Sequence, residues 1–287
     1  MYRKFSTFSA RNMKNLFRSL ILLSALAATC SAQAPKYSNE FLSIGVGARA
    51  LGMSNSYITS VDDVTAGYWN PAGLANIRNQ RQLALMHSEY FAGIAKYDYG
   101  AFATRLDSSS VLAISAIRFG VDGIPNTTEL IDANGNVDYS RITTFSAIDF
   151  AGIISYAKTM KIPGLRIGAS AKVIRRRVGD FAGAWGFGLD AGLQYDWKKW
   201  KLGVMARDIT STFNSWSYNI PENMQETFIA TGNDIPTNSV EITLPKLLLG
   251  VARKFTLSKK ISLQPELNLD ATFDGKRNVL IQSKVMS

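Results

Sequence analysis

The chain has 287 residues, of which 46% are hydrophobic and 19% charged, and this length can form one large domain or two smaller ones. The composition is too apolar for a disordered protein and too polar for a bundle of membrane helices. The net charge of +10 would suit nucleic-acid binding, but five basic residues and no acidic one lie before position 35. The remainder has 27 basic and 22 acidic residues, a dispersed excess that gives little reason to expect a nucleic-acid partner.

Residues 1–34 have the pattern of a cleaved export signal. Basic residues precede the apolar run Leu20–Ala28, and the segment 32–34 (Ala-Gln-Ala) fits the small-x-small cleavage pattern. Met13 is an alternative start of translation, and Cys30, the only cysteine, is an alternative lipidation site. No segment has the ~20 apolar residues that a membrane-spanning helix needs. We therefore expect an exported protein without transmembrane helices.

From about Gln80 onward, apolar and polar residues alternate with a period of two, which indicates strands whose two faces lie in different environments. The clearest examples are the segments 184–197 and 261–273. Both are longer than the strands of most globular sheets, and they match the length of strands in outer-membrane barrels. A soluble β-sandwich also alternates, but the aromatic residues at one strand end, Tyr195, Trp197 and Trp200, favour an interfacial girdle in a membrane.

The alternation predicts about ten strands. Their expected ranges are 81–89, 94–106, 110–120, 145–158, 165–177, 183–196, 201–210, 241–255, 261–271 and 278–287. The two long connections, 121–144 and 211–240, fall on one side, and tight turns fall on the other, as in outer-membrane barrels. We therefore expect an all-β protein in which residues 80–287 form a transmembrane antiparallel β-barrel. The chain ends in mid-strand without a terminal aromatic residue, so we expect the barrel to be truncated at its C-terminus.

Residues 35–79 are rich in glycine and small residues and do not alternate for long. Within them, the stretch 45–77 contains GVGARALGM and DDVTAGYWNPAGLA. This stretch resembles the N-terminal signature of the PorV/PorQ family, outer-membrane proteins associated with type IX secretion. Its core also resembles the NPA element of the wider FadL-like barrels, whose amino-terminal hatch plugs the lumen. The residues of this hatch motif are Asn70, Pro71, Ala72, Gly73 and Leu74.

The resemblance implies a function as well as a fold. A member of the PorV/PorQ family would bind or shuttle secreted cargo proteins and contact type IX translocon components in the outer membrane. The alternative is a FadL-like channel for hydrophobic small molecules, and a purely structural barrel is a third possibility. The hatch motif would then position a plug, although Asn-Pro-Ala-Gly also fits a simple turn after a short helix.

The sequence offers no convincing catalytic site. His87 is the only histidine, so a metal site with several histidines is impossible and a catalytic triad has a single candidate base. The segment 45–50 fits a loose dinucleotide-binding pattern but lacks the strand–helix unit around it. Asp62 and Asp63 alone are too few ligands for a calcium site. We expect no enzyme activity, no cofactor and no bound metal.

Two groups of residues are candidate contact sites. The first is a basic triplet at the end of a predicted strand, Arg175, Arg176 and Arg177. It is either a solvated rim or a site for lipopolysaccharide phosphates or another anionic group, because arginine binds phosphate with paired hydrogen bonds. The second is the long loop 211–240, whose aromatic residues make it a candidate for partner docking, unless it folds back onto the barrel mouth. These aromatic residues are Phe213, Trp216, Tyr218 and Phe228.

Overall fold

The computed structural model describes residues 38–131, 135–272 and 279–284, with side chains described as far as Thr272. The predicted export signal, residues 1–34, lies outside the described residues. Within the described part of the chain, no helix is long and apolar enough to cross a membrane.

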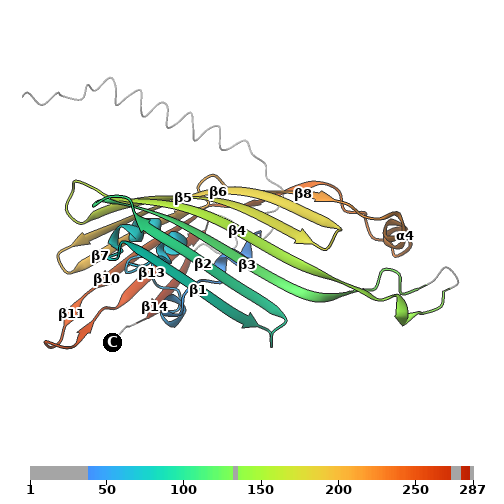
Figure 1. Ribbon diagram of the computed structural model, residues 1–287, viewed down its shortest axis with the longest axis horizontal. Helices are drawn as coiled ribbons and strands as arrows, with labels where there is room; N and C mark the ends of the chain where they lie inside the picture. The colour runs from blue at the N-terminus through green and yellow to red at the C-terminus, as the bar shows by residue number, and fades with distance from the viewer. Residues whose placement is uncertain (1–37, 132–134, 273–278, 285–287) are drawn as a thin grey trace, which may run out of the picture. The chain divides into compact units, whose positions relative to one another are not determined.

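Long antiparallel strands form one twelve-stranded sheet in the described residues. Its main path follows the chain through β1 (Arg81–Tyr90), β2 (Ala95–Arg105), β3 (Ser110–Asn126), β4 (Thr143–Thr159), β5 (Leu165–Val178), β6 (Ala182–Trp197) and β7 (Trp200–Arg207). It continues through β10 (Lys246–Arg253), β13 (Glu266–Thr272) and β14 (Val279–Lys284). A small separate hairpin pairs β11 (Phe255–Thr256) with β12 (Ser262–Leu263). The expectation of long antiparallel strands is confirmed (Figure 1).

The prediction of a loop over residues 211–240 is wrong for much of this range. Strand β8 (Thr212–Tyr218) continues the line of β7 after a break, and it pairs with the first half of β6. Strand β9 (Ser239–Thr243) then pairs with β8, and helix α4 (Glu222–Ala230) lies between the two strands in sequence. The physical reason is that β7 pairs only with the second half of β6, so the backbone groups of the first half need another partner.

The longer connections still fall on one side of the sheet. The turns after β2, β4 and β6 are short, whereas the connections after β3 and β8 are long. The connection after β3 is shorter than predicted, because β3 extends to Asn126 and β4 begins at Thr143. A register shift between Val121 and Ile124 accommodates this extension.

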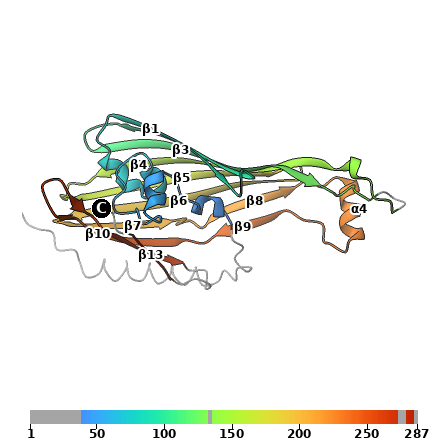
Figure 2. The same cartoon turned by 90° about the horizontal axis from the view of Figure 1, so that it is seen from below.

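Residues 38–79, here called the hatch, lie against one face of the sheet. The hatch consists of four short helices, η1 (Glu40–Ser43), α2 (Ala48–Gly52), α3 (Ala66–Trp69) and η2 (Pro71–Asn76). The backbone N–H of Val64 donates to Gln82 on β1, and that of Thr59 donates to Glu266 on β13, both at 2.8 Å. The same short segment contacts β1, at one edge of the sheet, and β13, next to the other edge, so the sheet curves around the hatch (Figure 2).

The two faces of the sheet differ in chemistry. The face away from the hatch is apolar and exposed: on β6 it carries Trp185, Phe187, Leu189 and Trp197. The face toward the hatch is buried, and beside apolar side chains it carries charged and polar ones, among them Asp190 and Gln194. The exposed apolar face distinguishes this sheet from that of a water-soluble protein, which exposes its polar face.

Candidate functional site

Asn70 joins the hatch to the sheet. Its side chain is fully buried, and its Oδ1 accepts a hydrogen bond from the backbone N–H of Ala72 at 3.2 Å, which caps η2 with Pro71 in the first turn. Its Nδ2 faces the carbonyl oxygens of Ile58, Leu193 and Val204 at 3.0, 3.2 and 3.3 Å. The motif therefore forms the local turn that the sequence allows, and the same side chain also reaches β6 and β7.

The remainder of the hatch motif fits against the sheet because of glycines on the strands. A Cβ atom on Gly168 of β5 would lie 2.5 Å from the backbone nitrogen of Ala72, and one on Gly192 of β6 would overlap with Asn70 Oδ1. Residues 58 and 59 come similarly close to β7 and β10. A Cβ atom on Gly203 of β7 would lie 2.8 Å from Thr59 Cγ2, and one on Gly250 of β10 would lie 2.7 Å from the same atom. We call these four residues the glycine row. Real Cβ atoms do not approach other atoms so closely, so only glycine permits this contact.

A buried ion network lies beside the hatch on β5, β6 and the break after β7. Lys172 Nζ is 2.9 Å from Asp190 Oδ1 and 2.5 Å from Asp208 Oδ1, and all three side chains are buried. The backbone N–H of Asp208 donates to Asp190 at 2.7 Å, and Thr212 donates to Asp208 at 2.5 Å. The network therefore fixes the break between β7 and β8 to the inner face of the sheet.

Arg207 connects this polar region to the hatch. Its guanidinium donates to the backbone carbonyl of Tyr68 at 3.1 Å and lies 5.1 Å from the centre of the Tyr68 ring. A cation over an aromatic face adds stabilisation beyond the hydrogen bond, and more so away from water. Arg207 thus holds α3 from the side of β7.

The aromatic residues of α3 organise the interior of the hatch. Tyr68 donates from its hydroxyl to the carbonyl of Leu42 at 2.6 Å and accepts from Gly45 N–H at 3.1 Å. Trp69 donates from Nε1 to the carbonyl of Val46 at 2.9 Å, and its ring packs edge-on against Tyr68 at 4.9 Å. Burial raises the pKa of the Tyr68 phenol, so the hydroxyl remains a donor to Leu42.

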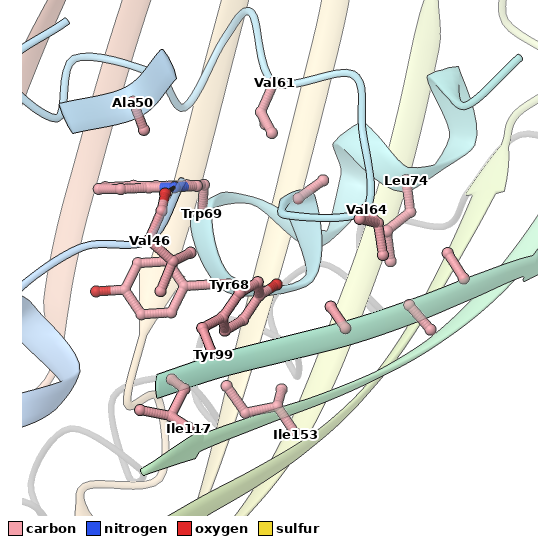
Figure 3. Close-up of a cluster of buried hydrophobic side chains, with 14 of the residues drawn as sticks. Val46, Ala50, Val61, Val64, Tyr68, Trp69, Leu74, Tyr99, Ile117 and Ile153 are labelled. Carbon is pink, nitrogen blue, oxygen red and sulfur yellow. Dashed lines mark hydrogen bonds between the residues drawn. The ribbon is translucent and has the colours of Figure 1, made fainter. Parts of the chain in front are cut away.

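The wall that faces these aromatic residues is apolar. Tyr99 on β2, Ile117 on β3 and Ile153 on β4 are buried in the same cluster as Tyr68 and Trp69 (Figure 3). Strands β5 to β13 instead carry the ion network and the other buried charged side chains, together with a few buried apolar ones such as Ile174 and Met205. The interior is therefore two-sided, with an apolar and aromatic half along β2–β4 and a polar half along β5–β13.

The predicted basic triplet is divided between the two faces of β5, so it does not form one site. Arg176 points inward, where its Nε and Nη2 lie 2.9 and 3.2 Å from the carboxylate of Asp149 and its guanidinium stacks 5.0 Å from the Trp216 ring. Arg175 and Arg177 both line a groove on the outward face. The expectation of three neighbouring arginines was wrong for Arg176, because successive side chains of a strand point to opposite faces.

The predicted docking residues are also separated. Phe213 is exposed on the outward face of β8, whereas Trp216 is buried on the inward face and stacks on Tyr218 at 6.1 Å. Phe228 lies on α4 and is half-buried. The four aromatic residues therefore do not share an exposed surface, because three of them belong to a strand and alternate between its faces.

His87 lies on the outward face of β1 and is exposed. Its Nδ1 is 2.6 Å from Asp98 Oδ1 on β2, and Asp98 also accepts from Arg118 at 3.2 Å. Ser88, its neighbour in sequence, lies on the opposite face of the strand. The candidate base therefore belongs to a surface charge cluster across β1, β2 and β3.

The contact of the hatch with the glycine row was not predicted from the sequence. Gly186 and Gly188 lie between large residues on β6, which is a sequence signal for close approach, but a Cβ atom on either would meet β8 and not the hatch. The identity of the approaching segment depends on the folded position of the hatch.

No protein-family model matches the chain, and no curated protein matches it. Among solved structures, the chain is similar to a hydrocarbon channel. That structure is a TodX deltaS2S3 mutant, described as a monoaromatic hydrocarbon channel, with 12% sequence identity and a TM-score of 0.47. The alignment covers 84% of this chain and 76% of that chain.

Proposed function

We propose that this chain is an outer-membrane β-barrel protein and that it admits hydrophobic small molecules along the apolar half of its interior. The observation that carries the membrane location is the chemistry of the two faces of the sheet, with apolar side chains exposed on the outward face and buried ion pairs on the inward face. This arrangement is typical of barrels that face lipid.

The distance between two tryptophans supports this location. Trp185 and Trp197 are exposed on the outward face of β6, and only apolar or aromatic side chains lie between them on that face. Their separation in sequence corresponds to about 40 Å along a strand and about 30 Å across the membrane at the usual strand tilt. The hydrocarbon core of a bilayer has about this thickness. At the end of the strands near the β6–β7 turn, basic side chains lie over the tryptophan rings: Lys198 over Trp197 and Arg253 over Trp200.

The two-sided interior supports the choice of substrate. A hydrophobic solute gains free energy by contact with apolar side chains, and it avoids the cost of desolvating the ion network if it follows β2–β4. Tyr99, Ile117 and Ile153 line this half opposite the hatch. Movement of the hatch away from these residues would open the route.

A matched pair of isoleucine variants on β4 tests the proposal. Ile153 points inward to the aromatic half, and Ile154 points outward. We expect Ile153→Trp to reduce uptake of a fluorescent fatty acid or a monoaromatic solute into proteoliposomes severalfold. Ile154→Trp should leave uptake unchanged, because its side chain faces lipid. Equal uptake by both variants and the original protein would contradict a route along β4.

A second candidate is the cargo-binding role that the resemblance to the PorV/PorQ family implies. The observation that favours it is the extension formed by β8, α4 and β9 (Figure 1). Thr227 on α4 donates to the carbonyl of Thr128 at 3.1 Å, so the helix is held against the connection after β3. This contact gives the extension a defined surface that a secreted protein could bind.

Affinity purification in mild detergent, followed by mass spectrometry of proteins and lipids, distinguishes the two candidates. Bound fatty acids or aromatic compounds without a protein partner would favour the channel. Recovery of secreted proteins that share a carboxyl-terminal sorting domain would favour cargo binding. In that case, deletion of 220–237 should abolish recovery.

A further inference from the structure

Arg175 is a cation on the outward face with most of its hydrogen-bonding capacity unused. Its guanidinium lies 5.1 Å from the centre of the Trp185 ring, and Nη1 donates to the carbonyl of Ala184 at 3.2 Å. In the described part of the chain, no carboxylate lies within salt-bridge distance of Arg175. Gly183 makes room for this position, because a Cβ atom there would lie 2.7 Å from Nη1.

A groove beside Arg175 is lined by further polar groups. It has a volume of about 490 Å³ and crosses β5, β6 and β8, where its lining includes Arg177, Ser215, Ser217 and Asn219. Arg177 is 61% exposed; its Nε donates to the carbonyl of Gly179 at 2.9 Å, and it pairs with the exposed carboxylate of Asp180 at the rim. The groove thus combines two arginines, one of them paired with Asp180, with hydroxyl and amide groups.

The next row of side chains toward the middle of the sheet is apolar. Arg175, Trp185 and Ser215 are register partners across the three strands, and two residues further along the same strands lie Val173, Phe187 and Phe213. These three apolar side chains are exposed. A cationic and hydroxyl-lined row therefore borders directly on an apolar row, on the same outward face.

We propose that this groove binds a phosphorylated glycolipid of the outer leaflet, with its phosphate on Arg175 and Arg177 and its acyl chains over Val173, Phe187 and Phe213. Arginine binds phosphate with paired, charge-assisted hydrogen bonds. The volume and the hydroxyl and amide lining suit sugar rings, which carry many hydroxyl groups, better than a small phospholipid headgroup. This inference rests on the proposed membrane location, with the long connections on the outer side.

The test uses the purified full chain in detergent, with hexa-acylated lipid A as the probe and native mass spectrometry as the readout. We expect Arg175→Gln to weaken lipid A binding by roughly tenfold or more, the usual effect of losing hydrogen bonds to a charged group. The control is Arg253→Gln, since Arg253 also lies over a tryptophan, Trp200 at 4.8 Å, but at the opposite end of the strands. Arg253→Gln should bind lipid A as the original protein does.

Competing lipids identify the headgroup. Lipid A without phosphate should bind weakly to the original protein, and Arg175→Gln should not weaken that binding further. Phosphatidylglycerol should compete poorly. Equal binding of phosphatidylglycerol and lipid A, or equal losses in the Arg175 and Arg253 variants, would overturn the proposal. Because the measurement is made in detergent, a failure of glycolipid binding is distinct from a failure of membrane insertion or solute uptake, which proteoliposomes report.

Discussion

Asn70 Oδ1 on the hatch occupies the position that a Cβ atom on Gly192 of β6 would need. The same amide caps η2 and contacts carbonyls of β6 and β7. The absence of one side chain on the wall therefore allows one side chain of the hatch to reach the backbone of two strands. This relationship, repeated at Gly168 against Ala72, explains how the hatch is held close to the sheet.

We expect Gly192→Ala to displace the hatch. The added methyl group overlaps with Asn70, and such overpacking costs about 1–3 kcal/mol. The measurement is the rate of hydrogen exchange at the amides of residues 66–76 together with the thermal midpoint. Gly152→Ala is the control, because a Cβ atom there meets nothing within 4 Å. If both variants exchange at the original rate, the hatch does not depend on the glycine row.

We expect Lys172→Met to destabilise the protein strongly. It removes the cation between Asp190 and Asp208, and breaking a buried ion pair by removing one partner costs about 3–5 kcal/mol. Urea unfolding in detergent measures the loss. Lys96→Met removes a cation from an exposed pair with Asp122 at 3.8 Å, and it should cost no more than about 1 kcal/mol. Partial recovery in Lys172→Met with Asp208→Asn would confirm that the uncompensated charge is responsible.

We expect an arginine at Leu189 to impair membrane insertion more than one at Ser217. Leu189 lies on the outward face of β6 between Trp185 and Trp197, and Ser217 lines the groove beside Arg175. An arginine near the bilayer centre costs about 2–4 kcal/mol, and one near the interface costs about 1 kcal/mol or less. The folded fraction of each variant in lipid vesicles, measured at increasing urea concentrations, gives the free-energy cost of each arginine. Equal costs would contradict the proposed position of the bilayer.

The stabilisation that the turn between β2 and β3 contributes to the fold should depend on pH. Hydrogen bonds from Ser110 and from Ser109 to the carboxylate of Asp107 hold the pKa of that carboxyl well below its usual range. Because the folded-state pKa is lowered, the stabilisation is present above the ordinary value, about 4, and is lost as the pH falls toward the folded-state pKa. Asp107→Asn should therefore reduce stability at pH 7 and reduce it less at pH 3. A difference that does not change with pH would contradict this assignment.

Most strands could be predicted from the sequence, because an apolar–polar alternation is a local signal. The predicted strand 241–255, however, is divided into β9 and β10, and the alternating segment 261–273 is divided into β12 and β13. The range 165–177 is Leu165–Val178 in the structure, and 183–196 is Ala182–Trp197. The same period places Arg176 on the face opposite Arg175, so the division of the basic triplet follows from the sequence alone. The expectation of a single arginine cluster was wrong because the three residues are adjacent in sequence but point to two different faces of the strand.

Features that depend on long-range pairing were harder to predict. Residues 212–218 contain serine and asparagine, as loops do, yet they form β8 because the first half of β6 requires a partner. The break before β8 includes Asp208 and Ser211, both with positive φ, and the contact of Asp208 with Lys172 stabilises it. Neither the pairing nor the ion network has a signal within 208–218 itself.

The glycine row also has a consequence for how related sequences can diverge. A side chain at position 168 or 192 cannot be accommodated while Ala72 and Asn70 stay in place. Substitutions at these strand positions are therefore coupled to substitutions in the hatch, although the two segments are more than ninety residues apart in the chain. Exchanging the hatch between two distant relatives should succeed only when the matching strand positions are exchanged with it.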